Sequence, residues 1–189
     1  MVMLVLLLTV CVASLAGGLA QVGHTERWIA GAHLRAVQTS YAANAAARLT
    51  MEGIALNSTS AHWPSDGQVP ALPGGARVMA LAAGESVDLD ARTNELNAEV
   101  RRQWSLGPDT PIWRLAGWGA LPGVTAPGRR VAVWIADDVM DQDGIPGEDV
   151  NGMLMIHVEA FGPRGATRLV DVHVRREAEA VRTISWREG

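Results

Sequence analysis

The first part of the chain is an uninterrupted apolar run. Residues 1–23 carry no charged side chain, and every residue from Val2 to Ala20 is apolar or small. These nineteen residues, as an α-helix, span roughly 28 Å at about 1.5 Å per residue, close to the thickness of the hydrocarbon core of a bilayer. The pattern therefore predicts a membrane-spanning helix over residues 1–23.

A secretory signal peptide is the alternative interpretation of this run. Such a peptide has a basic start, a shorter apolar stretch and a cleavage site of small residues. Gly18-Leu19-Ala20 before Gln21 would serve as the cleavage site, whereas no Lys or Arg precedes the run. This segment alone leaves the two interpretations close.

The residues that follow favour a retained helix. Residues 24–56 contain no proline and are rich in alanine, which favours helix. Apolar residues recur there at steps of three and four, on one side of the predicted helix. They are Ala30, Leu34, Val37, Tyr41, Ala45 and Leu49. The pattern predicts an amphipathic helix extension over residues 24–56, suited to packing against other copies or partner helices, and a signal peptide does not usually continue into such a helix.

The composition changes after this helix. Residues 57–75 are rich in Ser, Pro and Gly and are expected to form a linker or loop. Residues 76–189 are expected to form a β-rich globular domain, with a short helix from about Asn94 to Leu106 that ends before Gly107-Pro108. Strands are predicted over residues 130–136, 153–161 and 168–175.

The last two of these strands can be paired from their apolar positions. If the numbers of facing residues sum to 330, Ile156 faces Val174, Val158 faces Val172 and Ala160 faces Val170, which gives one clean apolar side. The other side then pairs His157 with His173 and Glu159 with Asp171. The predicted fold class is α+β: a long N-terminal helix, membrane-spanning and then amphipathic, packed on a small antiparallel β-sheet.

Composition, charge and the lack of known catalytic motifs exclude several classes of function. The chain has 16 basic and 20 acidic side chains and a net charge of −4, which argues against nucleic acid as a partner because phosphate binding needs a basic face. The only cysteine is Cys11 in the apolar run, so neither an intrachain disulfide nor a cysteine-ligated metal site can form. No G-x-S-x-G, P-loop or H-E-x-x-H motif is present, and we expect no enzymatic activity.

The block from His24 to Leu49 contains a recognisable order of residues. Thr25-Glu26 is followed by Ala30-Gly31, then Arg35, then Tyr41-Ala42-Ala43. This order resembles the N-terminal helix of PilX-type pilus assembly proteins, the minor-pilin-like components of bacterial type IV pili. Four later segments are similar to the same family: Asp109–Leu121, Asp137–Gly152, Glu159–Arg176 and Ile184–Glu188. The resemblance implies a pilin-like fold and a membrane-embedded subunit that joins or primes a pilus, without catalytic chemistry.

The sequence departs from the family at two points. Asn44 stands where the family usually has a glutamate. Prepilins are also cut before the apolar segment, after a basic leader that ends in glycine, and carry a glutamate five residues into the mature chain. No basic leader and no acidic residue precede Glu26 here. Either a leader lies upstream of Met1, or the chain is not processed as a prepilin.

An acidic segment between two predicted strands is the candidate metal site. Its candidate ligands for calcium are Asp137, Asp138, Asp141, Asp143, Asp149 and Asn151. Calcium prefers several oxygen ligands from a flexible loop. The EF-hand pattern fails, however, because with Gly144 as the turn glycine the first and last ligand positions are Val139 and Val150. The alternative is a solvated hairpin loop with Asx turns, and we favour it over calcium.

Two other groups of residues suggest chemistry. The predicted ladder of His157, His173, Glu159 and Asp171 could hold zinc, although a solvent-facing polar side with arginines nearby is the favoured interpretation. Four tryptophans could form a carbohydrate platform or the core, and the core is favoured because the chain has only one Phe and one Tyr. They are Trp104, Trp113, Trp118 and Trp134.

These observations lead to one expected function and one main alternative. We expect a non-enzymatic subunit of a type IV pilus or related secretion filament, anchored in the cytoplasmic membrane with its globular domain outside the cytoplasm. Its expected partners are the membrane and other pilin or pseudopilin subunits, which it contacts through the N-terminal helix. The alternative is an anchored or secreted calcium-dependent binding or adhesion module. A secreted enzyme is the least favoured class.

Overall fold

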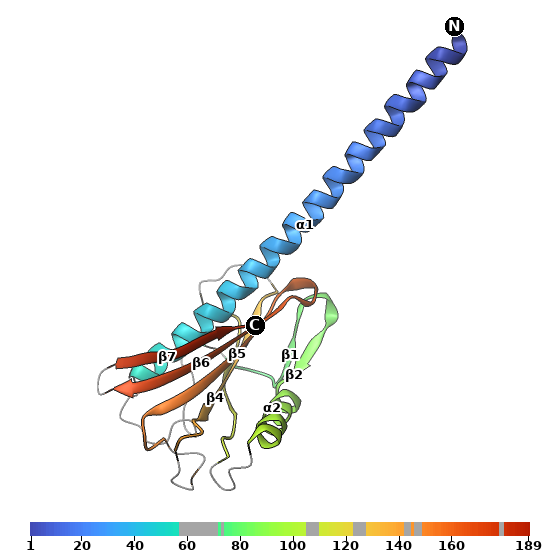
Figure 1. The fold of residues 1–189 in the computed structure, drawn as a ribbon. Coiled ribbons are helices and arrows are strands. Elements are labelled where there is room, and N and C mark those ends of the chain that lie inside the picture. The colour runs from blue at the N-terminus through green and yellow to red at the C-terminus, as the bar shows by residue number, and fades with distance from the viewer. Residues whose placement is uncertain are drawn as a thin grey trace.

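The expected fold class is confirmed: a long N-terminal helix packs on an antiparallel sheet (Figure 1). The computed structural model describes residues 1–56, 72, 74–104, 110–122, 128–141, 145, 149–177 and 180–189. Most of the predicted linker over residues 57–75 therefore lies outside the described residues.

The N-terminal helix α1 spans Val2–Leu56 as one element of 55 residues. Figure 1 shows its first half running clear of the domain before the second half lies along the sheet. By length and composition α1 could cross a membrane, and its most apolar stretch of 18 residues has no part buried within the molecule. Gly17, Gly18 and Gly23 all lie inside the helix.

The remaining elements form two antiparallel sheets and a second helix. In chain order they are β1 (Val78–Ala80), the 3₁₀ turn η1 (Ala82–Gly84), β2 (Ser86–Asp88), α2 (Leu89–Gln103), β3 (Arg114–Gly119), β4 (Arg130–Asp137), β5 (Met153–Phe161), the 3₁₀ turn η3 (Pro163–Gly165), β6 (Thr167–Glu177) and β7 (Ala180–Glu188). Strands β3 to β7 make a five-stranded sheet in sequence order, and β1 pairs with β2.

The helix α1 meets the sheet through small side chains. Its buried residues are Thr39, Ala42, Ala43, Ala46, Ala47, Thr50, Gly53 and Ile54. The sheet supplies the bulk of this core through branched residues such as Val133, Ile156 and Val172. Small residues on the helix let its backbone approach these side chains closely, which keeps the interface densely packed.

The apolar stripe predicted on residues 24–56 is not the face that packs on the sheet, although Ala45 and Leu49 at its end are partly buried against the core. Its expected packing against other copies or partner helices stays a prediction. Leu34 is 56% exposed and Tyr41 is 72% exposed. At about 100° per residue, positions 34 and 41 lie opposite the buried alanines. The predicted stripe contains the larger apolar side chains of this segment, whereas the residues that pack on the sheet are mostly alanines.

The hairpin between β5 and β6 also approaches α1 closely. A Cβ atom added to Gly162 would collide with the hydroxyl of Thr39, which donates to the Arg35 carbonyl at 2.8 Å. Gly162 is therefore required by the close contact with the helix, because its φ of −107° is open to any residue.

The two faces of the sheet have different covers. Side chains of Val131, Val133 and Ile135 point into the core under α1, while Ala132 and Trp134 point to the other side. Strand alternation explains this division. On that second side, Leu89 and Leu96 of α2 pack against Trp134. The strands β4 and β5 are thus buried between a long helix and a short one, whereas β7 is largely exposed.

The helix α2 begins earlier than predicted. Asp88 caps it, because its carboxylate accepts the N–H groups of Asp90 and Ala91 at 3.0 Å each. The helix therefore starts at Leu89, not at Asn94, and it ends at Gln103. The predicted stop at Gly107-Pro108 lies outside the described residues.

The three predicted strands are present, but the predicted pairing of the last two was wrong by two residues. Facing residues sum to 328, so Ile156 faces Val172 and Val158 faces Val170. The turn is shorter than expected, because Gly162 donates its N–H to the Ala166 carbonyl at 2.6 Å and β6 starts at Thr167. A shift of two residues keeps every side chain on its predicted face.

Candidate functional site

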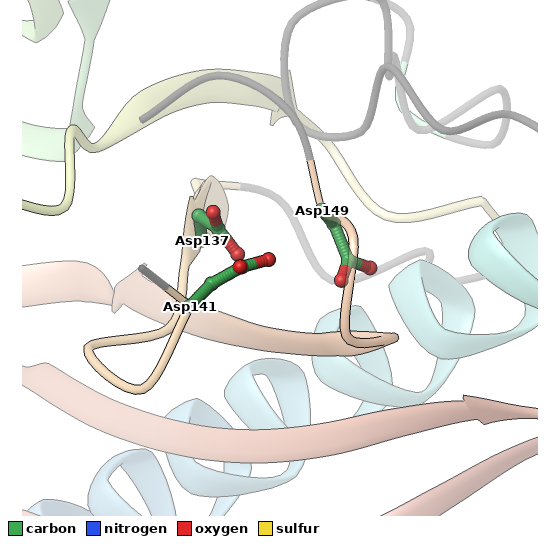
Figure 2. Close-up of side chains that lie close together, drawn as sticks. All are labelled: Asp137, Asp141 and Asp149. Carbon is green, nitrogen blue, oxygen red and sulfur yellow. The ribbon is translucent and has the colours of Figure 1, made fainter. Parts of the chain in front are cut away.

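The acidic segment brings three carboxylates together. Asp137 ends β4, Asp141 follows in the adjoining turn, and Asp149 precedes β5. Oxygen atoms of these three side chains all lie within 4.8 Å of one another, and the three residues are buried (Figure 2). Asp138 is also buried, Asn151 is exposed, and Asp143 lies outside the described residues.

Backbone N–H groups and neighbouring side chains already occupy many of these oxygens. One oxygen of Asp141 accepts from the N–H of Val150 at 2.8 Å and of Asn151 at 3.2 Å. Asp138 accepts from the N–H of Met140 at 3.1 Å and from the Asn151 amide at 2.7 Å. A predicted Asx turn is therefore present at Asp138, and the longer-range bonds of Asp141 and Asn151 connect the two ends of the segment.

The predicted solvation of the segment, in contrast, was wrong for Asp137, Asp138, Asp141 and Asp149, which are buried. Asp149 is paired with Arg176 of β6 at 2.7 Å and accepts the Gly152 N–H at 2.6 Å. The Arg176 side chain is itself only 9% exposed. This arginine is a site residue that sequence reasoning missed, because its partner is 27 residues away in the chain.

Burial and crowding shift the pKa values of two of these carboxyls. The pKa of Asp137 is raised to about 7, chiefly by burial and also by the carboxylates of Asp141, Asp149 and Asp138, against a hydrogen bond from the Asp138 N–H that lowers it. Burial also raises the pKa of Asp149, although Arg176 opposes the shift. A divalent cation with oxygen ligands would relieve this crowding, and Asp137, Asp141 and Asp149 are the residues that could hold it.

The predicted zinc ladder does not form. Because of the two-residue register difference, His157 faces Asp171, and His173 faces Met155 and, on the next strand, Ser185. His173 is exposed, while His157 and Glu159 are buried under α2. The favoured solvent-facing interpretation was therefore wrong for His157 and Glu159.

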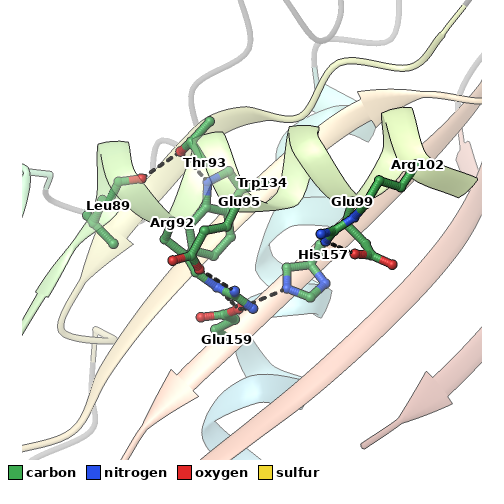
Figure 3. A network of polar contacts seen from close by, with 9 residues as sticks. All are labelled: Leu89, Arg92, Thr93, Glu95, Glu99, Arg102, Trp134, His157 and Glu159. Atoms are coloured by element: carbon green, nitrogen blue, oxygen red, sulfur yellow. Dashed lines mark hydrogen bonds and ion pairs between the residues drawn. The ribbon is translucent and has the colours of Figure 1, made fainter.

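A buried charge network replaces the ladder (Figure 3). His157 contacts Asp171 at 2.6 Å through Nδ1 and Glu159 at 3.2 Å through Nε2. Arg92 of α2 donates from Nε to the same Glu159 oxygen at 2.7 Å. The imidazole also lies 5.7 Å from the rings of both Trp113 and Trp134.

The network favours the charged form of His157. Burial lowers the pKa of His157, but hydrogen bonds with Asp171 and Glu159 more than offset this, so its pKa is raised. Burial raises the pKa of Glu159 and Asp171, and their contacts with His157 reverse the shift for both. In this network the Arg92–Glu159 ion pair connects α2 to β5, and the His157–Asp171 contact connects β5 to β6.

Sequence reasoning missed Arg92 because the predicted helix began at Asn94. A usable signal was present: Asp88 followed by Asp90 is typical of a helix N-terminus. A helix that begins just after Asp88 includes Arg92 in its first turns, and this helix packs on the sheet.

The tryptophans divide between core and surface. Trp134 is fully buried, and its Nε1 donates to Thr93 at 2.8 Å, which confirms the predicted core role for this ring. Trp113 and Trp118 are partly buried against the same cluster. Trp104 is 45% exposed, so the predicted core role was wrong for this residue.

Comparison with known proteins does not place the chain in a family. It matches no family model, no curated protein sequence and no solved structure. A functional conclusion therefore depends on the geometry of the helix α1 and of the domain it carries.

Proposed function

We propose that the chain is a non-enzymatic, membrane-anchored structural subunit of the minor-pilin kind, which joins or primes a type IV pilus or a related secretion filament. The observation that carries the proposal is the division of α1 into two halves. Its apolar half is free of the domain, and its alanine-rich half forms the core with β4, β5, β6 and β7. One continuous helix thus links the proposed membrane anchor to a sheet domain.

The proposed location follows from the same helix. The apolar residues of α1 would lie in the cytoplasmic membrane, because nineteen such residues match a bilayer core in length. The globular domain would lie outside the cytoplasm. Exposed Trp28, Leu34 and Tyr41 would then lie outside the lipid, Trp28 nearest to it and Tyr41 level with the domain, where helices of other pilin or pseudopilin subunits can contact them.

Charges placed in the apolar half test this proposal. Leu8→Arg combined with Val12→Arg puts two cations on one side of the proposed anchor, and each costs roughly 2.5–3.5 kcal/mol at the centre of a membrane helix. We expect the double variant to leave the membrane fraction of the native host and to fail to restore surface filaments in a strain that lacks the gene. Tyr41→Arg, in the exposed extension, is the matched control and should remain in the membrane fraction.

Mass spectrometry of the mature protein from the membrane fraction provides the deciding measurement. A retained apolar segment, above all with a methylated first residue, supports a pilin-like subunit. A mature chain that begins at Gln21 contradicts the proposal, because the apolar run would then be a removed signal peptide. Normal filament numbers in the deletion strain would contradict it as well.

A calcium-dependent binding module is the second candidate, and the convergence of Asp137, Asp141 and Asp149 favours it. Calcium should then raise the melting temperature of the full chain by several degrees through preferential binding to the native state. Asp141→Asn should abolish this rise, whereas Asp90→Asn, at an exposed position in α2, should preserve it. Calorimetry without binding heat, together with an unchanged melting temperature, would rule out this candidate.

A further inference from the structure

The helix α2 covers only part of the outer face of the sheet, and a cavity of about 410 Å³ lies beside it. Residues of α2, β5, β6 and β7 line this cavity, together with the segment before β3. All of these elements belong to the globular domain, away from the N-terminal end of α1 (Figure 1). The volume falls in the range of roughly 300–1,000 Å³ that small-molecule sites occupy.

One wall of the cavity is aromatic and apolar. Trp104 and Trp113 stand at this wall, next to Leu96 and Val100 of α2. Trp104 is the more exposed of the two rings, at 45%. A large aromatic ring left half open in a concave site presents a flat apolar surface to a ligand.

The floor of the cavity is polar. Asp171 faces Arg187 across the β6–β7 pair, and His173 faces Ser185 one step away. Asp171 and His173 alternate with buried residues of β6, and since facing residues of paired strands point to the same side, Arg187 and Ser185 share their outer face. The floor therefore offers several hydrogen-bond donors and acceptors within one small area.

The charged side chains around the cavity are of both signs. Glu99 is paired with Arg102, Asp171 is paired with His157 at 2.6 Å, and Arg187 stands opposite Asp171 on the next strand. Neither sign therefore dominates among these residues. The cavity therefore favours a neutral ligand with many hydroxyl groups and one apolar face.

We propose that this cavity binds a neutral saccharide unit of a glycan. A pyranose ring has apolar C–H faces that can stack on Trp104, and its hydroxyl groups both donate and accept, as the floor requires. This activity goes beyond the structural role proposed above, because it gives the subunit a ligand of its own outside the membrane.

Binding of free neutral sugars to the full chain tests the proposal. The chain is placed in phospholipid nanodiscs free of glycolipid, since detergents with sugar headgroups would compete. The probes are glucose, galactose, mannose and N-acetylglucosamine with their short oligosaccharides, and binding is followed by saturation-transfer NMR. We expect at least one neutral sugar to bind, and Trp104→Ala to weaken that binding by at least tenfold.

A second variant and a matched control separate a lost site from a lost fold. His173→Ala changes an exposed floor residue and should also weaken binding, with an unchanged melting temperature. Trp28→Ala removes an exposed tryptophan of α1 and should bind as the native chain does. Failure of the whole neutral panel, binding that both cavity variants retain, or binding only of an anionic sugar such as glucose 6-phosphate would each overturn the proposal. None of these results depends on whether the chain joins a filament.

Discussion

Replacement of Arg92 by methionine is expected to lower the free energy of unfolding by about 3 kcal/mol. The Glu159 side chain is only 4% exposed. Among the residues that the structure describes, Arg92 and His157 are the basic side chains paired with its carboxylate, so the variant leaves it with His157. Loss of one member of a buried ion pair typically costs about 3–5 kcal/mol, because the other charge stays buried. The Arg92 side chain is 33% exposed, which places the effect at the lower end.

Denaturant unfolding of the full chain, followed by tryptophan fluorescence, measures this loss. Arg101→Met, at an exposed position of the same helix, is the control and should change the free energy by less than about 0.5 kcal/mol. The double variant Arg92→Met with Glu159→Leu should recover most of the stability, since it removes both buried charges. Equal stability of Arg92→Met and the native chain would show that the network does not fasten α2 to the sheet.

The long helix and the three central strands could be predicted because their signals are local. The apolar run and the proline-free, alanine-rich segment predict α1 without knowledge of its neighbours. Strand β4 keeps its apolar character through Val131, Val133 and Ile135 because both of its sides are covered. The face of α1 that packs could not be predicted, since the shape of the sheet decides that small residues are preferred there.

The sites were harder to predict because they depend on pairing between distant segments. A turn shorter than expected after Phe161 moved His157 away from His173 and placed it opposite Asp171. Arg92 and Arg176 then reach buried carboxylates from α2 and β6. The acidic cluster could be located from the sequence because its members are close in the chain, whereas its burial could not.

A change of Asp137 to asparagine is expected to stabilise the chain at pH 8 by about 4 kcal/mol and to have little effect at pH 4. Burial raises the pKa of Asp137 to about 7, while the unfolded chain has the ordinary value near 3.9. Between these values the native state binds the proton that the unfolded state has released. The contribution of Asp137 is therefore complete below pH 4 and is lost as the pH rises through about 7.

Asparagine imitates the protonated carboxyl, because its side-chain oxygen can still accept the Asp138 N–H that Asp137 accepts at 2.9 Å. Thermal unfolding between pH 4 and pH 8 should show a higher melting temperature for the variant than for the native chain, and this difference should increase with pH. His157 also has a raised pKa, so both chains lose stability towards alkaline pH, and only the difference between them reports on Asp137. Asp90→Asn, at an exposed position, should show no such difference. A melting-temperature difference that stays constant from pH 4 to pH 8 would contradict the buried, protonated carboxyl. If the three carboxylates hold calcium, saturating calcium would stabilise the native chain and remove the higher stability of the variant.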